Sequence, residues 1–467
     1  MRKFGLALVL AALCLLGGSA QAQAPAAPEL AKQLDPFFDA LESGGRMHGS
    51  VAIARDGKLL YRRSVGMRSE GNGSPVPANV DTMYRVGSIA KVFTAVMIYQ
   101  LIDEGELSLG TKLSAFYPSI PNAERITIAH LLSHSSGLGN YPPPEAAADR
   151  ASWVFQPQSK QQMLARLAAL KPEYEPGEKS TYSNTNFTLL GYILEQVTRS
   201  TYAAQLERRI ARPLGLKRTR FGGAIRAAGN EAHSFTYDDG RWMRHSEEHP
   251  SVSAGSGGVI STPSDLAKFM SAIFDRRLMT AKSVTEMLTP FSERLPGSEK
   301  GIVVFKLADR DRTAYQHLGG IDAFSSSLTW LPDDRTAIAI SFNGQSYPMG
   351  KVFYSLVDAV AGRPVEVPSF AAIELGAETL ERFEGIYAFP EIGMSITIRR
   401  DGNQLSAQAT DQEPFPIHAI GKTTFSHPPS GILLEFRPNA AGDGYAHLTL
   451  YQGRSQLRFK REAAAPK

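Results

Sequence analysis

Hydrophobic positions near the N-terminus fall first into two extended runs and then into a helical stripe. The runs at residues 51–55 and 59–63 flank an Asp-Gly dipeptide, which predicts an antiparallel hairpin. Behind Ser88, apolar residues recur at helical spacing as far as Ile102, and a glycine follows that can end a helix. We expect a buried helix that begins near Ser88.

Further helical and extended patterns follow before residue 362. The helical patterns cover residues 161–170, 186–197 and 264–274. Short runs of β-forming residues, separated by turn residues, cover residues 314–316, 325–330 and 337–342. This order of elements predicts a mixed α/β fold in which helices flank an antiparallel sheet.

The composition changes at Ala361-Gly362-Arg363-Pro364, after which helical patterns almost vanish. The remaining apolar runs are short and punctuated by turn residues, and they cover residues 383–387, 394–399, 432–436, 447–451 and 456–460. Such spacing predicts a small all-β barrel or sandwich of about 90 residues.

The first residues have the pattern of a secretory signal. Arg2 and Lys3 precede an apolar run at residues 6–16, and a small-residue cleavage site ends at Ala22. We expect export to the periplasm or the medium, because no later stretch has the roughly 20 apolar residues of a membrane span. Cys14, the chain's single cysteine, lies in this segment, so cysteine nucleophiles and thiolate metal sites are excluded from the mature protein.

The charge balance excludes a nucleic-acid partner. The chain has 50 Lys and Arg against 46 Asp and Glu, a formal net charge of +4 over 467 residues, with no basic cluster that could follow a phosphate backbone. With 43% hydrophobic and 21% charged residues, the composition is that of a soluble globular protein with two or three domains. A small molecule or a peptide is the expected partner, and the oligomeric state stays open.

Ser88 and Lys91 form the chain's only Ser-x-x-Lys motif. Residues three apart share one helix face, so the Lys91 amine can reach the Ser88 hydroxyl. An amine buried among apolar neighbours loses its proton more readily and can serve as the base that activates a serine. The alternative is that Ser88 merely caps the helix.

Two other motifs carry groups suited to the same chemistry. Tyr182-Ser183-Asn184 is the chain's only Tyr-x-Asn motif. The Tyr182 phenol can relay a proton, and the Asn184 amide can bind Lys91 or a substrate carbonyl. The alternative is that Tyr182 is simply packed in a loop. His317-Leu318-Gly319-Gly320 follows a candidate strand, where glycines let an edge strand bring its N–H groups close to a reacting carbonyl. A purely structural histidine is the alternative.

Other catalytic arrangements are disfavoured. His130 and His134 are four residues apart, but no clear third metal ligand accompanies them. No serine lies in the Gly-x-Ser-x-Gly pattern of the α/β-hydrolases, and no Gly-x-x-x-x-Gly-Lys loop is present. We therefore expect neither a metal nor another cofactor.

Taken in order, the three motifs resemble those of the penicillin-recognising serine hydrolases: class C beta-lactamases, D-Ala-D-Ala carboxypeptidases, D-aminopeptidases and related esterases. The resemblance implies that family's fold, with an all-helical subdomain beside the sheet, and that the stretches around His134 and Gly257 shape the site. Phe383-x-Gly385-x-Tyr387 is similar to the lipocalin-like domain often fused behind such enzymes. The implied division is a signal peptide at 1–22, a hydrolase domain at 28–362, a linker at 363–373 and a lipocalin-like barrel at 374–467.

The resemblance also implies a role for each motif residue. Ser88 attacks the carbonyl and becomes acylated, Lys91 and Tyr182 handle the protons, and Asn184 orients the substrate and Lys91. The backbone N–H groups of Ser88 and Gly320 form the oxyanion hole, within a substrate-binding edge that also includes His317 and Gly319 (residues as numbered in this chain). Water then releases the acyl group, and no cofactor is needed.

One departure from the family pattern concerns the third motif. Many relatives carry Lys-Ser/Thr-Gly there, whereas this chain has His317 and no such lysine motif anywhere. With a reference pKa of about 6.5, a histidine is charged only part of the time near neutral pH, so we expect weaker or pH-dependent binding of an anionic substrate. This favours an amide- or ester-hydrolysing enzyme, with a D-amino-acid peptide as one candidate substrate, over an antibiotic-degrading one. A carboxylesterase or lipase on the same fold and a non-catalytic penicillin-binding sensor remain the alternatives.

Overall fold

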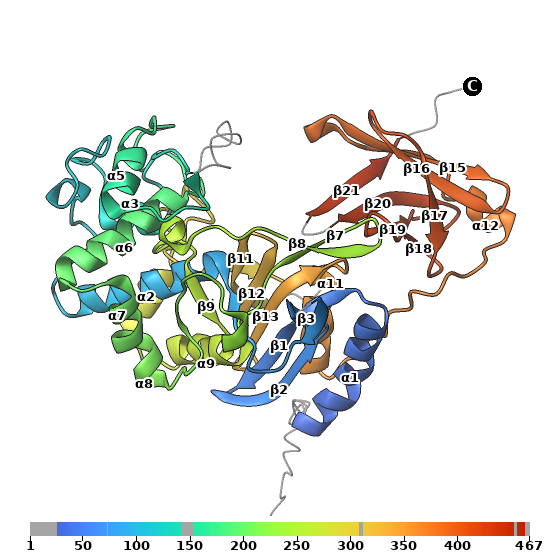
Figure 1. Cartoon of the computed structure of the whole chain (residues 1–467). Coiled ribbons are helices and arrows are strands. Elements are labelled where there is room, and N and C mark those ends of the chain that lie inside the picture. The colour runs from blue at the N-terminus through green and yellow to red at the C-terminus, as the bar shows by residue number, and fades with distance from the viewer. Residues whose placement is uncertain (1–25, 72, 142–152, 308–311, 453–454, 463–467) are drawn as a thin grey trace, which may run out of the picture.

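The computed structural model of the chain describes residues 26–71, 73–141, 153–307, 312–452 and 455–462. A sheet flanked by helices forms the larger part, and a barrel lies beside it (Figure 1). The proposed signal segment at 1–22 lies outside the described residues. No helix in the described residues is long and apolar enough to cross a bilayer.

The central sheet is antiparallel throughout, with the strand order β10-β11-β12-β13-β1-β2. Its strands are β1 (Met47–Arg55), β2 (Lys58–Val65), β10 (Val303–Lys306), β11 (Thr313–Ile321), β12 (Phe324–Leu331) and β13 (Thr336–Gln345). The predicted hairpin is confirmed as β1 and β2, and the strands predicted at 325–330 and 337–342 are β12 and β13. The pattern at 314–316 belongs to a longer strand, because β11 runs on through the His317 motif.

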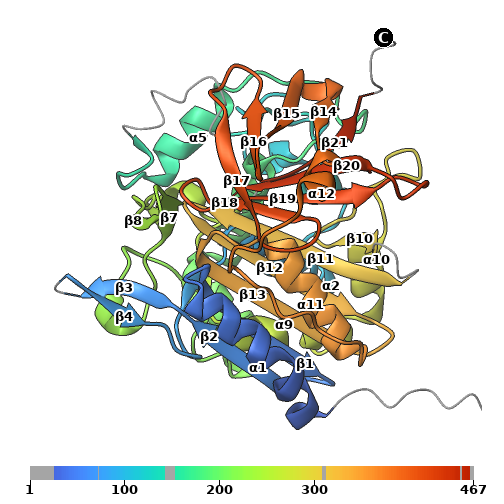
Figure 2. The same ribbon diagram turned by 90° about the vertical axis from the view of Figure 1, so that its right-hand side faces the viewer.

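Both faces of the sheet are covered because its side chains alternate between two cores. Val51 and Ile53 of β1 pack with α1 (Ala27–Ser43) and α11 (Met349–Val360), which lie over one face in Figure 2. Ala52 and Ala54 belong to the core on the other face, which contains the helices described next.

The helices on that second face form the region that carries the predicted motifs. They are α2 (Ala90–Asp103), α3 (Ile128–Leu132), α5 (Lys160–Ala168), α6 (Asn184–Thr198), α7 (Tyr202–Leu206), α8 (Arg212–Leu214), α9 (Pro263–Phe274) and α10 (Ala281–Leu288). The helices predicted behind Ser88 and at 161–170, 186–197 and 264–274 are confirmed as α2, α5, α6 and α9. Helix α2 is buried on every side from Ala90 to Tyr99, as expected of a mostly apolar helix enclosed by its neighbours.

Short sheets link these layers and support the entrance to α2. They comprise β3 (Met67–Gly71) with β4 (Ser74–Pro77), β5 (Tyr84–Arg85) and β6 (Arg220–Phe221) on either side of β9 (Val259–Ser261), and β7 (Phe235–Asp238) with β8 (Arg241–Arg244). Strand β5 leads directly into a 3₁₀ turn, η1 (Gly87–Ile89), and then into α2.

The C-terminal part is a closed eight-stranded antiparallel barrel. Its strands are β14 (Gly385–Phe389), β15 (Met394–Asp401), β16 (Gln404–Ala409), β17 (Phe415–Ala419), β18 (Thr424–His427), β19 (Ile432–Pro438), β20 (Tyr445–Gln452) and β21 (Ser455–Arg461). The all-β prediction is confirmed, although the sequence pattern did not resolve β16, β17 or β18. A short helix, α12 (Ala377–Glu381), precedes the barrel, and the first strand starts at Gly385 rather than Phe383.

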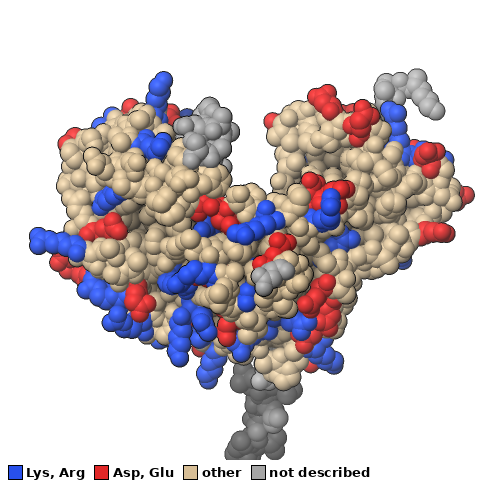
Figure 3. Space-filling model, in the orientation of Figure 1, with Lys and Arg blue, Asp and Glu red and all other residues tan. Residues whose placement is uncertain are grey.

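Polar contacts join the barrel to the rest of the molecule. The Lys351 ammonium of α11 lies 2.6 Å from the Glu435 carboxylate and over the ring of Tyr451. The Gly240 N–H, at the β7–β8 turn, donates to the Pro429 carbonyl. In the space-filling view, a wide hollow separates the barrel from the helical region (Figure 3).

Candidate active site

Ser88 lies in η1, where β5 turns into α2. Gly87 makes this turn possible, because its φ of +52° lies in the region that favours glycine. A Cβ on Gly87 would also lie 2.7 Å from the Gly320 nitrogen, so the two backbones touch. Among the described residues, no side-chain hydrogen bond caps the start of η1 or of α2. The capping interpretation of Ser88 is therefore wrong, and its hydroxyl is available for other partners.

Lys91 extends from α2 into a fully buried position beside Ser88. Its amine lies 3.0 Å from Ser88 Oγ, 2.8 Å from Asn184 Oδ1 and 2.8 Å from the Ser256 carbonyl oxygen. None of these partners carries a negative charge. Burial lowers the pKa of Lys91 well below its ordinary value, because nothing at this position compensates for the lost hydration of an ammonium.

The three partners of Lys91 match the donors and acceptors of a neutral amine. Such an amine has two N–H bonds and one lone pair. The Asn184 and Ser256 oxygens can only accept, so they take the two N–H bonds. The lone pair then faces the Ser88 hydroxyl, which is the arrangement required for removing its proton.

Tyr182 also places its phenol at hydrogen-bond distance from the Ser88 oxygen. Its Oη lies 2.6 Å from Ser88 Oγ, although the residue as a whole is 46% exposed. Burial of the hydroxyl raises its pKa to about 12, while the hydrogen bond to Ser88 opposes that rise. Tyr182 is therefore a protonated phenol near neutral pH, suited to donating or relaying a proton rather than to acting as the resident base.

The His134 ring packs against the Tyr182 ring. The two rings lie 4.6 Å apart, and His134 Nδ1 accepts the backbone N–H of Ser183. Burial, with smaller contributions from Lys91 and His317, lowers the pKa of His134 to about 3, so it stays neutral. This agrees with its expected part in shaping the site.

The metal interpretation of the two histidines has no support in this geometry. His130 makes a capping interaction with Thr127 at the start of α3. Within the described ranges, no three His, Cys, Asp or Glu side chains gather where they could hold a metal ion.

Asn184 is the first residue of α6, and each of its polar groups has a partner. Its Oδ1 accepts from Lys91, its Nδ2 donates to the Tyr141 carbonyl, and its backbone N–H donates to Asn140 Oδ1. The amide is thus fixed with its oxygen toward Lys91.

The Ser256 carbonyl is a site group that the motif search did not find. It accepts from Lys91 within the glycine-rich stretch Gly255-Ser256-Gly257-Gly258. Gly255 has a φ of +78°, and a Cβ there would overlap the Phe187 carbonyl. The density of glycines was the available signal, because close backbone approach requires them.

The third motif lies in β11, beside the η1 turn. Pairing between β10 and β11 stops at Gln316, so the following residues of β11 have one open edge. The β11–β12 hairpin closes through a two-residue turn after Ile321. By the alternation of an antiparallel ladder, Gly320 then directs its N–H toward the open edge, away from β12. A Cβ on Gly319 would overlap the Val86 oxygen, so this position requires glycine.

His317 is half-buried and electrically neutral, which corrects the expectation of partial charge near neutral pH. Burial, with a smaller contribution from the neighbouring Lys91 side chain, lowers its pKa to about 4. Its Nδ1 lies 2.7 Å from the Leu318 carbonyl, which can only accept, so Nδ1 carries the hydrogen and Nε2 is an acceptor.

A model of one protein family, described as Beta-lactamase, matches residues 34–361. The chain belongs to the beta-lactamase family. This match spans the central sheet and the three motifs. It identifies the protein as a serine hydrolase of that family, and the site above lies within the matched residues.

Curated relatives in the family include peptidases and an esterase. Penicillin-binding protein 4* of Bacillus subtilis is 24% identical over 436 residues, which cover 87% of this chain and 93% of the relative. The D-alanyl-D-alanine-carboxypeptidase/endopeptidase AmpH of Escherichia coli is 30% identical over 52% of this chain and 62% of its own length. Esterase EstB of Burkholderia gladioli is 32% identical over 46% and 56%. The chain thus matches somewhat over half the length of the last two.

Solved structures agree with this beta-lactamase-family fold. A D-stereospecific amidohydrolase from Streptomyces sp. is 28% identical, with a TM-score of 0.56 over 67% of this chain and 94% of that one. The octameric penicillin-binding protein homologue from Pyrococcus abyssi is 21% identical, with a TM-score of 0.63, and it covers 92% of this chain and 99% of its own. At that identity the second likeness concerns the fold alone, barrel included.

Proposed function

We propose that this protein hydrolyses an amide or ester bond through an acyl-enzyme on Ser88. The observation that carries the proposal is the hydrogen-bonded set around the Ser88 oxygen, with the Lys91 amine at 3.0 Å and the Tyr182 phenol at 2.6 Å. A serine becomes a nucleophile when a neighbouring base takes its proton, and a neutral amine at hydrogen-bond distance meets that need.

The proton path follows from the protonation states of the two groups. Lys91 takes the Ser88 proton as the oxygen attacks the carbonyl carbon. The Tyr182 phenol donates to the departing amine or alcohol and is reprotonated from Lys91, whose amine lies 4.8 Å from the tyrosine ring centre. Water then attacks the ester on Ser88 with the same groups acting in reverse, which restores the free enzyme.

The developing oxyanion would be held by the backbone N–H groups of Ser88 and Gly320. The contact between Gly87 and Gly320 supports this assignment, as does the open edge of β11. Such donors are effective because they are fixed before the charge forms, and loss of one typically costs about 10²–10³ in rate.

The preferred substrate would have no carboxylate at the position that faces His317, because a neutral histidine offers that group no positive charge. Neutral His317 offers the Nε2 lone pair, which suits an amine, amide N–H or hydroxyl of the substrate. We therefore favour a D-amino-acid amide, or a peptide cleaved away from its free carboxylate, in line with the name of the D-stereospecific amidohydrolase. An ester is the second candidate, favoured by the same neutral anchor and by the likeness to esterase EstB.

Location and domain organisation belong to the same proposal. We take residues 1–22 as a signal peptide that directs export to the periplasm or the medium, residues 28–362 as the hydrolase domain, and residues 374–467 as a lipocalin-like domain behind a linker at 363–373. The charge pattern of the first residues and the closed barrel support this division.

The test compares the mature protein with a Ser88→Ala variant. Both are treated with a fluorophosphonate and a fluorescent penicillin, then assayed on p-nitrophenyl esters, nitrocefin and D-amino-acid amides and peptides. We expect labelling and turnover in the wild type only. Labelling that survives in Ser88→Ala would refute the nucleophile, and penicillin labelling without turnover of any substrate would favour a sensor. Tyr182→Phe should slow acylation by about 10²–10⁴-fold if the phenol relays protons.

A further inference from the structure

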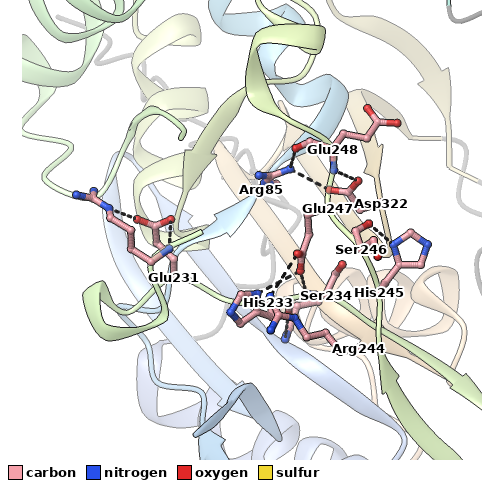
Figure 4. Close-up of polar contacts among 12 residues, drawn as sticks. Arg85, Glu231, His233, Ser234, Arg244, His245, Ser246, Glu247, Glu248 and Asp322 are labelled. Atoms are coloured by element: carbon pink, nitrogen blue, oxygen red, sulfur yellow. Dashed lines mark hydrogen bonds and ion pairs between the residues drawn. The ribbon is translucent and has the colours of Figure 1, made fainter. Parts of the chain in front are cut away.

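A buried ion pair lies next to the two backbone segments that meet at Ser88. Arg85 precedes the nucleophile by three residues, and Asp322 follows Gly320 by two. Their side chains are 7% and 1% exposed, and the guanidinium lies 3.1 Å from the carboxylate. Figure 4 shows the pair with the peptide of Glu248 beside it. Neither residue touches the Ser88, Lys91 and Tyr182 cluster in the hydrogen bonds described above.

The pair joins the two chain segments that would supply the proposed oxyanion hole. The 85–88 segment enters α2 from β5, whereas Asp322 forms the β11–β12 turn. Between them, the Ser326 hydroxyl donates to the Val86 carbonyl, and Gly87 lies against Gly320. The ion pair therefore lies at one end of the contact between these two segments, and the proposed oxyanion hole lies at the other end.

The Glu248 peptide fixes both members of the pair. Its carbonyl accepts from Arg85 at 2.6 Å, and its N–H donates to Asp322 Oδ1 at 2.9 Å. Arg85 also donates to the Gly223 carbonyl at 3.3 Å. Each charged group is held from more than one direction, so neither can shift without breaking several contacts.

From this juxtaposition we propose that Arg85 and Asp322 are positioning residues that hold the Gly320 N–H in register with Ser88. The proposal rests on the acyl-enzyme function above, since it concerns the site where the oxyanion forms. The hydrogen bonds described for Arg85 and Asp322 do not reach Ser88, Lys91 or Tyr182, so the pair acts through the spacing of two backbones.

One feature of Asp322 sets it apart from an ordinary stabilising contact. That feature is not its φ of +52°, which is the left-handed conformation that aspartate and asparagine adopt at turns, as Asp56 and Asp239 also do. Burial raises the pKa of its carboxyl to about 6, so the ionised form opposes folding near neutral pH. A buried carboxylate whose charge opposes folding suits a role in the function of the site rather than in stability.

The experiment uses Asp322→Asn, Arg85→Gln and the double variant, with an ester that the wild type hydrolyses. Asparagine tolerates the same backbone conformation and keeps an oxygen for the Glu248 N–H, while it removes the charge. We expect kcat/KM to fall by about 10²-fold, the cost of misplacing a reacting group by about 1 Å. The loss should appear in kcat, and affinity for a boronic acid that forms a tetrahedral adduct on Ser88 should fall in parallel. Binding of intact ester to variants that also carry Ser88→Ala should be unchanged.

The matched control is Glu231→Gln. Glu231 is also a buried carboxylate, with Arg220 and Arg226 as its ion-pair partners and a backbone N–H donor. Figure 4 shows it apart from Arg85 and Asp322, and its described ion pairs and hydrogen bonds do not involve residues 85–88 or 319–322. We expect it to keep wild-type kcat at whatever cost in melting temperature. The double variant should be no slower than the slower single variant, because the two residues act as a unit.

The inference fails if Asp322→Asn keeps wild-type kcat and boronate affinity, if Glu231→Gln loses as much, or if the two single losses add. Failure of the proposed function looks different. In that case the fluorophosphonate does not label Ser88 in the wild type, and both proposals fall before any Asp322 variant is compared.

Discussion

Lys91 and Lys300 are both almost completely buried, at 0% and 3% exposure, yet they face different partners. The Lys300 ammonium lies 3.1 Å from the Glu286 carboxylate and donates to the Thr289 carbonyl. Lys91 meets only neutral oxygen atoms. A counter-charge repays part of the cost of burying an ammonium, whereas neutral acceptors leave the amine easier to deprotonate.

Lys300 and Lys91 differ in the charge of their hydrogen-bond partners and not in their degree of burial, and this difference distinguishes a structural lysine from a reactive one. Lys300 follows α10 and ties that helix to the adjacent loop. Lys91 is held just as firmly, but by groups that do not favour its charged form. The following predictions exchange or remove these partners, from the largest expected effect to the smallest.

Lys91→Met should reduce kcat/KM by about 10⁴-fold, because it removes the group proposed to take the Ser88 proton. Methionine fills a similar volume without an amine. The measurement is the rate of Ser88 acylation by an ester and by a fluorophosphonate. Lys300→Met is the matched control: it should keep that rate and lower the melting temperature. Equal rate losses in the two variants would contradict the distinction drawn here.

Asn184→Asp would give Lys91 the counter-charge that Lys300 already has. A carboxylate 2.8 Å from the amine should raise the pKa of Lys91. Because less neutral amine is then available, kcat/KM near neutral pH should fall by about 10²-fold and recover as the pH rises. The pH–rate profile checks this. An acid limb that stays in its wild-type position would show that Lys91 is not the base.

The pH dependence of stability should also distinguish Lys91. Its pKa is lowered on folding, so the unfolded state binds this proton more readily. The wild type should therefore lose stability relative to Lys91→Met as the pH falls from about 10.4, the ordinary lysine value, toward the lowered pKa. Denaturant unfolding of both proteins across that range measures the difference. A constant difference would mean that folding does not perturb Lys91.

Glu286→Gln should have the smallest effect. The carboxylate is partly exposed, so its loss should cost about 1 kcal/mol of unfolding free energy. Kcat should not change, because α10 contributes no group to the Ser88 cluster. Thermal unfolding and the ester assay provide both readings. A fall in kcat without a change in stability would assign Lys300 a part in the site.

The sequence predicted those parts of the site that depend on local spacing. Ser88 and Lys91 are one helical turn apart, so their contact follows from α2 alone. The association of this pair with Tyr182 and His317 came instead from the family resemblance, since no periodicity shows which loops meet in space. The Ser256 carbonyl was not predicted as a ligand of Lys91, because the glycines around it indicate a close backbone approach without showing which side chain the backbone meets.

Properties that depend on the folded surroundings were also missed. The ordinary pKa of histidine suggested a partly charged His317, but burial and the nearby Lys91 make it neutral. In the barrel, β16 mixes Gln and Ser with small Ala side chains and lacks the strong apolar run that marked other strands. This segment forms a strand because it pairs with β15 and β17 in the closed barrel.

The contact of Gly87 with Gly320, and of Gly319 with Val86, has a consequence for altering this enzyme. Main chain meets main chain at these contacts, so no side chain lies between the nucleophile turn and the oxyanion strand that could be trimmed or enlarged. A mutant library aimed at new substrates should leave these glycines fixed and vary the surrounding rim, such as exposed Leu318. The rim positions would then determine which substrate is preferred, while the fixed glycines would preserve the reaction.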